Sequence, residues 1–268
     1  MKGFKKGTFS TILTMAIPSM LESFFVCFAG LVDSFMVSSM GPEAVAAVGL
    51  TTQPKFLGLS IFMALSVAVS ALVARRLGQN DKKSANGILL TTLSLVIILA
   101  AVLSVVFVLF APQILIWCGA TPDTHSMAVT YLRIIMGGMI FNCIQICINS
   151  AQRGAGNTKI TMRTNITSNT VNVIFNYLLI GGKFGFPKLG IAGAALATVL
   201  GTVVSSVMSI ISISKPSCFI NIPYIIKEKI KPSFEYVKSI FNVGYSVFFE
   251  QILLRVGFMA TALMAAAQ

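Results

Sequence analysis

The sequence predicts an all-α membrane protein whose helices cross the bilayer seven times. Of the 268 residues, 56% are hydrophobic and only 10% are charged, whereas about 25% of the residues in a soluble domain carry charge. Seven stretches are long and apolar enough to span a bilayer, which takes about 20 residues. The Lys and Arg residues gather in alternate connections between these stretches. Together these observations argue against a soluble enzyme with a water-facing surface.

The expected spans follow one another with polar or glycine-containing connections between them. They cover residues 11–40, 51–74, 88–111, 127–149, 164–181, 190–213 and 239–268. The connection 215–238 is the longest and contains three prolines and mixed charges. We therefore expect a six-helix lobe over residues 1–214, a linker over 215–238, and the first helix of a second lobe over 239–268.

The basic residues predict how the chain lies in the membrane. Fifteen of them precede the first stretch or follow the second, fourth and sixth: Lys2, Lys5, Lys6, Arg75, Arg76, Lys82, Lys83, Arg153, Lys159, Arg163, Lys215, Lys227, Lys229, Lys231 and Lys238. The other side holds Lys55, Arg133, Lys183 and Lys188, and Arg255 lies within the seventh stretch. Because cytoplasmic connections carry the Lys and Arg excess, we expect a multi-pass protein of the cell (inner or plasma) membrane with a cytoplasmic N-terminus and linker. The net charge of +12 then reflects topology rather than nucleic-acid binding.

The first stretch contains two carboxylates, Glu22 and Asp33. Eleven residues are close to three helical turns, so both lie on one face, about 16 Å apart along the axis. A charge at mid-bilayer costs about 2.5–3.5 kcal/mol on insertion scales and generally marks function. We interpret this face as a cation or proton path, with Asp33 as the ligand of a metal cation. The alternative is a buried ion pair with Arg133 or Arg255, or a cap, and Glu22 fits an anchor between helices equally well.

The fifth stretch aligns four asparagines, Asn165, Asn169, Asn172 and Asn176, on one helix face. They predict either a polar wall that coordinates ions and water or a set of interhelical hydrogen bonds. Asn172 and Asn176 lie near the outer end of their helix, as Asp33 does, so these three are expected to meet at one depth. The fourth and sixth stretches add candidates for a polar interior, namely Asn142, Gln145, Asn149, Thr198 and Thr202. We predict that Asn142, Gln145, Asn149 and Asn169 line a substrate cavity.

The seventh stretch resembles the first. Aligning Glu22 with Glu250 gives a shift of 228 residues, and both glutamates lie a similar distance into an apolar helix. This similarity indicates a parallel six-helix repeat whose second copy begins at the seventh stretch. Pro18, one turn before Glu22, leaves a carbonyl unpaired and is the predicted hinge of the first helix. A Pro18→Ala variant with full transport and normal pH dependence would contradict that role.

Three segments are similar to the multidrug and toxic compound extrusion (MATE) transporters. The residues that carry the resemblance are 31–37 with 41–49, 151–158 and 190–198. The resemblance implies a twelve-helix antiporter with two six-helix lobes around a central cavity, of which this chain would be a truncated, N-terminal portion. Such proteins export organic, often cationic, compounds in exchange for sodium ions or protons. It also implies no other cofactor, a small drug or organic cation as substrate, the lipid bilayer as surroundings, and a monomer at full length.

The resemblance also assigns roles to particular residues. Asp33 matches the first-helix aspartate that binds the coupling cation in the N-terminal lobe, and Thr198 matches a sixth-helix threonine near that site. Asn172 and Asn176 match polar positions of the fifth helix, although many relatives carry aspartate at the position of Asn176. Glu250 matches a seventh-helix glutamate that is proposed to serve the second lobe. The substitution at Asn176 leaves the choice between proton and sodium open.

Two other functions remain as alternatives. A lipid-linked oligosaccharide flippase of the same superfamily needs a cationic cavity, whereas the expected spans offer mostly carboxylates and amides. A seven-helix receptor or light-driven protein fits the helix count. However, the N-terminus of the usual receptor lies outside the cell, opposite to the orientation predicted for this chain, and the seventh stretch has no lysine for a retinal Schiff base. The sequence has no Walker loop and no Ser/His/Asp set, so we expect a transporter and not an enzyme.

Overall fold

The structure is a computed structural model that describes the backbone of residues 6–216 and 218–266 and the side chains of residues 13–216 and 218–254. The described residues form α-helices joined by turns. The helices are α1 (Lys6–Ser38), α2 (Pro42–Gly78), α3 (Lys82–Trp117), α4 (Pro122–Gly137), α5 (Met139–Gly154), α6 (Thr158–Gly181), α7 (Ile191–Ile213), α8 (Ile222–Lys227) and α9 (Phe234–Ala266). The predicted all-α fold is confirmed.

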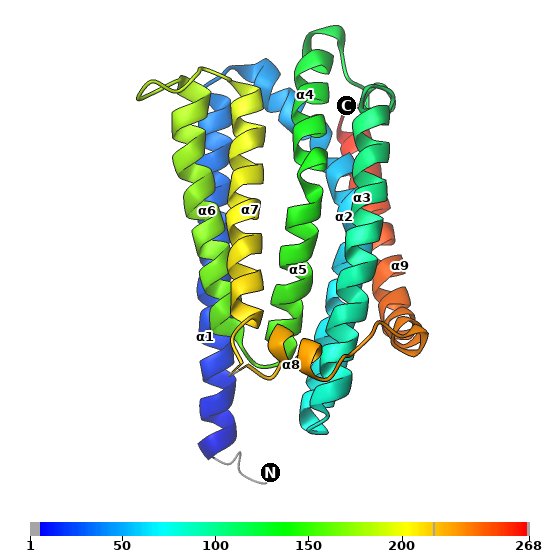
Figure 1. The fold of residues 1–268 in the computed structure, drawn as a ribbon. Helices are drawn as coiled ribbons and strands as arrows, with labels where there is room; N and C mark the ends of the chain where they lie inside the picture. Colours follow the sequence, from blue (N-terminus) through cyan, green and yellow to red (C-terminus); the bar gives the residue numbers. More distant parts are fainter. Residues whose placement is uncertain (1–5, 217, 267–268) are drawn as a thin grey trace.

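The long helices stand side by side in an up-and-down bundle (Figure 1). Helix α6 packs against α1 and α7, while α2 packs against α3, α5 and α9. Contacts of α4 and α5 with α7 join the two groups. We call the end that carries α8 the linker end, and the opposite end, with the connection 182–190, the loop end (Figure 1). The basic connections after α2, α5 and α7 all lie at the linker end.

Four helices in the described part are long and apolar enough to cross a membrane, namely α1 over Leu13–Ser38, α2, α3 and α7. A fifth crossing results if α4 and α5 count as one span. The expected span 164–181, which became α6, falls short of this criterion. The expected span 239–268 lies partly outside the described residues, so the criterion covers only part of α9. In α6 the reason is the number of asparagines and threonines along the helix. Helix α6 nevertheless runs beside α1 and α7 in the bundle (Figure 1).

The predicted fourth span is two helices that meet at a bend of 47°. Gly138 lies at the bend, between α4 and α5. A Cβ atom there would come within 2.6 Å of the Val199 side chain of α7, so only glycine allows α7 to pack so close to the break. Gly193 and Gly201 on α7 also lie against backbone, because a Cβ would come within 2.7 Å of Leu179 O and 2.6 Å of Ser168 O, respectively.

Helix α2 begins nine residues before the predicted start of the second span. Gly41 adopts a positive φ of 109° and ends the turn after α1, and Pro42 occupies the first position of α2. Proline suits that position because its missing N–H has no partner there in any helix. Lys55, which the predicted span 51–74 already contained, lies well inside α2, thirteen residues after its start. Helix α9 likewise begins early, at Phe234 and not at residue 239.

Candidate functional site

The structure brings Asp33 together with three polar residues of α6 and α7. Asn176 Nδ2 donates to Asp33 Oδ1 and lies 3.3 Å from Asn172 Oδ1. Asn172 Nδ2 donates in turn to Thr198 Oγ1 at 3.0 Å. The Thr198 hydroxyl donates to the Ala194 carbonyl of its own helix at 3.0 Å. The four side chains thus form one hydrogen-bonded chain across α1, α6 and α7, which we call the outer network after the depth predicted for Asp33.

The oxygens of the outer network suit a small cation. Asn176 is fully buried, and its Oδ1 has no hydrogen-bond partner among the described residues. A buried acceptor without a donor costs free energy, so such an oxygen favours a cation or a donor beside it. Alkali and alkaline-earth cations prefer carboxylate and carbonyl oxygens. No cluster of three His, Cys, Asp or Glu side chains occurs in the described part of the chain, so a cation at Asp33 depends on amide and hydroxyl oxygens.

Two further residues belong to the surroundings of Asp33, and neither was predicted from the sequence. Lys55 of α2 is half-buried and is near enough to Asp33 for an electrostatic interaction. Its Nζ also lies 5.3 Å from the ring centroid of Phe56. Tyr131 of α4 is buried and also interacts electrostatically with Asp33. The predicted span 51–74 already contained Lys55, but nothing in the sequence indicated that its side chain approaches Asp33.

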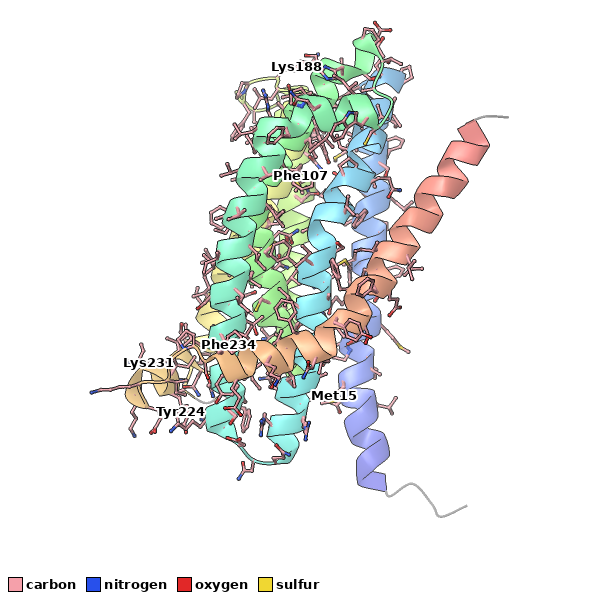
Figure 2. The ribbon with its side chains drawn as sticks, turned by 90° about the vertical axis from the view of Figure 1, so that its right-hand side faces the viewer. Met15, Phe107, Lys188, Tyr224, Lys231 and Phe234 are labelled. Atoms are coloured by element: carbon pink, nitrogen blue, oxygen red, sulfur yellow. The ribbon has the colours of Figure 1, made fainter. Side chains whose placement is uncertain are left out.

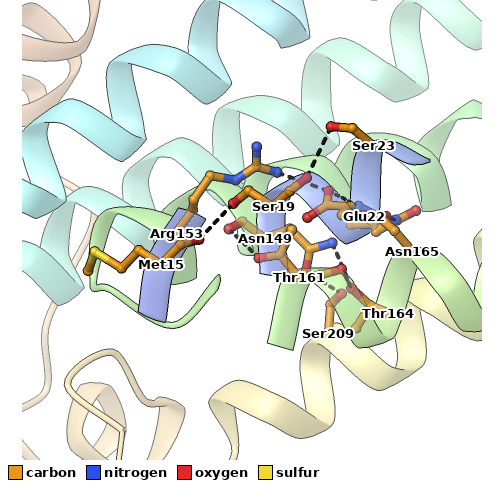
Figure 3. Close-up of polar contacts among 11 residues, drawn as sticks. Met15, Ser19, Glu22, Ser23, Asn149, Arg153, Thr161, Thr164, Asn165 and Ser209 are labelled. Atoms are coloured by element: carbon orange, nitrogen blue, oxygen red, sulfur yellow. Dashed lines mark hydrogen bonds and ion pairs between the residues drawn. The ribbon is translucent and has the colours of Figure 1, made fainter. Parts of the chain in front are cut away.

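Glu22 takes part in a second network, nearer the linker end (Figure 3). Asn165 Nδ2 donates to Glu22 Oε1 at 2.6 Å, and Gln145 Nε2 donates to Asn165 Oδ1 at 2.5 Å. Arg153, at the end of α5, places its guanidinium nitrogen 3.6 Å from Glu22 Oε1. Glu22 therefore joins α1 to α5 and α6. These partners fit the alternative stated above, an anchor between helices, and they compete with an ion for the carboxylate.

Asn149 belongs to a third set of polar contacts, beside the Glu22 network (Figure 3). Its Nδ2 donates to Thr164 Oγ1 at 2.9 Å, and its Oδ1 accepts from Ser209 Oγ at 3.0 Å. Its backbone carbonyl accepts from Thr161 Oγ1 at 3.3 Å. Gln145 and Asn149 are both buried, at 6% and 3% exposure. Their amides are thus used between helices, whereas the predicted role was on a cavity wall.

The comparisons with known proteins agree with this fold. The MatE family profile matches residues 18–178, which is more than half of the chain. The chain belongs to the MatE family. Its relatives include a probable multidrug resistance protein NorM of Thermotoga maritima, 26% identical over 251 residues, and a probable multidrug resistance protein YoeA of Bacillus subtilis, 26% identical over 254 residues. Each alignment covers 94% of this chain, but only 53% and 55% of the relative.

Solved structures show the same similarity for this MatE chain. It superimposes on a MOP superfamily transporter from Pyrococcus furiosus with a TM-score of 0.82 and 27% identity, over 90% of this chain and 52% of that chain. A MATE structure in a bent conformation gives a TM-score of 0.80 with 27% identity, over 90% of this chain and 53% of that chain. The chain therefore spans about half the length of the relatives that it matches.

The other predicted site residues of the MatE chain lie apart from the outer network. Asn169 lines a cavity between α1 and α6 with Phe25 and Phe28, and its Nδ2 is buried without a partner in the described structure. Asn142 is half-buried on α5, and Pro18 is buried within α1. Glu250 is exposed on α9, which packs against α2 and α3. The side chain of Arg255 lies outside the described part. The roles of all these residues stay predictions.

Proposed function

We propose that the whole protein is a secondary active antiporter that exports organic, often cationic, compounds in exchange for protons or sodium ions. This chain then supplies the first lobe (1–214), the linker (215–238) and the first helix of a second lobe (239–268). The outer network carries the proposal, because it holds the carboxylate of Asp33 beside an unpartnered amide oxygen. The relatives named as multidrug resistance proteins support the same function.

The mechanism follows from the two states of Asp33, with and without a bound ion. With a cation or proton bound, the carboxylate is neutralised, and the hydrogen bonds of Asn176 and Asn172 hold it in place. When the ion leaves, the buried charge must find another partner, which favours a different packing of α1 against α6. Pro18, one turn before Glu22, is the proposed hinge for that change. A flippase for anionic sugar lipids fits less well, since a carboxylate and amides line this site.

The orientation belongs to the same proposal. From the basic residues at the linker end, we infer that this end and the N-terminus face the cytoplasm. Asp33 then lies in the outer half of the membrane, where it is accessible to ions that drive export. The proposed site consists of Asp33, Asn172, Asn176 and Thr198, with Glu22 and Glu250 as the corresponding acids at the linker end and in the second lobe.

The test is efflux of a fluorescent organic cation from cells that express the gene at its natural length. We expect Asp33→Asn to abolish ion-driven efflux, because an amide cannot exchange a proton or balance a sodium ion. Asn176→Asp, which adds a second carboxylate, is expected to retain activity with an altered ion dependence. If Asp33→Asn leaves ion-driven efflux unchanged, the proposed role of Asp33 is wrong.

A further inference from the structure

The connection between α7 and α9 is fastened to α3 by a buried asparagine. Asn86 is fully buried near the start of α3. Its Nδ2 donates to the Phe219 carbonyl at 3.1 Å, and its Oδ1 accepts from the Asn221 backbone N–H at 2.9 Å. Asn221 in turn caps α8, since its Oδ1 accepts from the Tyr224 N–H at 2.8 Å. The connection thus has a defined position on the bundle.

Further contacts hold the segment that leads into α9. The Ser233 N–H donates to Thr91 Oγ1 of α3 at 3.2 Å. Tyr236 packs directly over Gly87, where a Cβ atom would come within 2.5 Å of the ring. Lys82 Nζ lies 4.8 Å from the ring centroid of Tyr224. α8 and the start of α9 are therefore held as one rigid piece on the flank of α3.

The outward face of this piece combines lysines with large apolar side chains. Ile226 is 70% exposed and Phe234 is 83% exposed. Lys227, Lys229 and Lys231 are exposed between them. We call these five residues the linker platform. Figure 2 shows Lys231 at one corner of the linker end, directed away from the bundle, with Tyr224 and Phe234 beside it.

The charge of the platform is net positive. Two exposed acids, Glu228 and Glu235, lie in the same segment. Lys82 and Lys83 of α3 add to the lysines on this flank, and the nearby Asp81 is paired with Arg76 at 3.4 Å. A rigid basic surface with protruding apolar side chains, at the end of a membrane bundle, is complementary to anionic phospholipid: the ammonium groups meet the phosphates, and the apolar groups enter the acyl boundary.

We propose that the linker platform binds anionic phospholipid of the surrounding bilayer. Lysines at a membrane surface each add about fivefold in affinity for anionic lipid. The apolar residues add affinity that is independent of headgroup charge. The proposal concerns this surface alone, and it stands whether or not the antiport function does.

The test is native mass spectrometry of the purified 268-residue chain, titrated with phosphatidylglycerol in competition with phosphatidylcholine. We expect wild type to retain phosphatidylglycerol preferentially. Lys227→Gln with Lys231→Gln is expected to weaken phosphatidylglycerol binding about 25-fold, at about fivefold for each lysine. The matched control is Lys159→Gln with Arg163→Gln, which removes two exposed charges at the linker end, near the start of α6. It should change binding little.

A second variant separates the apolar contribution. Phe234→Ser is expected to weaken binding of both lipids alike, with an unchanged circular dichroism spectrum because the side chain is exposed. Inorganic phosphate is added as a competitor, and it should not displace the lipid. Equal losses in the platform and control variants, no loss in either, displacement by phosphate, or dimers of the chain in place of bound lipid would each overturn the proposal.

Discussion

Asp33 and Lys55 put opposite charges in one region of the lobe. The two helices run in opposite directions from the turn at residues 39–41, and Asp33 lies closer to that turn than Lys55 does. Side chains of a helix tilt toward its N-terminus, so the Lys55 stem extends back toward the loop end and the level of Asp33. The ammonium group is then a cation that belongs to the protein itself and competes with the proposed coupling ion for the same carboxylate.

A Lys55→Gln substitution should therefore tighten cation binding at Asp33. We expect roughly tenfold higher sodium affinity, about 1.4 kcal/mol, which is modest for one charge interaction at an effective dielectric constant near 20. The measurement is thermal unfolding of the purified chain titrated with sodium chloride against choline chloride, at acidic and alkaline pH. Lys188→Gln, at the loop end, is the control. Unchanged or weaker sodium affinity in Lys55→Gln would contradict the competition.

The sequence was sufficient to predict that Asp33, Asn172 and Asn176 lie at one depth. Helical periodicity fixes the helix face on which each residue lies and its distance from the end of its helix. The sequence did not show that Lys55, within the predicted span 51–74, approaches Asp33. Hydropathy placed the second span at residue 51, since Glu43 and the small residues after it lower the apolar average. The backbone at Gly41 and Pro42 starts the helix earlier. Which asparagine bonds to which acid also depends on how α1 and α6 are rotated about their axes. The positions of asparagines on one helix face do not determine that rotation.

At the scale of helices, close packing depends on glycines that face backbone. Gly154 ends α5, and a Cβ there would lie 2.3 Å from the Ser70 carbonyl oxygen of α2. Because backbone cannot shift cheaply, we expect Gly154→Ala to destabilise the chain by about 1–3 kcal/mol. Gly49→Ala, in α2 with nothing within 4 Å, should instead be neutral or stabilise by up to about 1 kcal/mol. Thermal unfolding in detergent measures both, and equal effects would disprove this account.

The hydrogen bonding of the linker to Asn86 of α3 is a second feature at the scale of helices. Asn86→Ala removes the donor to Phe219 and leaves the buried Asn221 N–H without its acceptor, which costs about 1–3 kcal/mol. We expect residues 219–236 to detach locally, so that trypsin cleaves at Lys227, Lys229 and Lys231 faster than in wild type. Asn242→Ala, exposed on α9, is the control. Identical cleavage rates in wild type, Asn86→Ala and Asn242→Ala would show that the Asn86 hydrogen bonds do not hold the linker on α3.

Across the whole molecule, the charge asymmetry makes a prediction about sidedness. In a background with Cys27, Cys118 and Cys218 replaced by Ser, we expect an impermeant maleimide to label Phe184→Cys in intact cells. Lys231→Cys should be labelled only after the membrane is permeabilised. Phe184 is 85% exposed at the loop end, so access is not limited by packing. The opposite labelling pattern would reverse the proposed orientation.

The sequence predicted the order of the long helices, because apolar length and charge alternation are properties of the chain alone. It did not predict that the fourth span breaks at Gly138, although adjacent glycines at 137 and 138 were visible. The break depends on how closely Val199 of α7 approaches. The extent of the linker was also missed, since α8 and the early start of α9 depend on contacts with α3.

The Asn86 contacts join positions 133 and 135 residues apart in the chain. Between them lie α4, α5, α6 and α7. During synthesis, Asn86 is made long before Phe219 and Asn221, and until then its side chain has only the Lys82 carbonyl of its own helix as a partner, at 2.8 Å. This contact therefore forms only after α4, α5, α6 and α7 have been synthesised. A chain arrested before residue 221 would leave Asn86 Oδ1 without the Asn221 N–H that it accepts from.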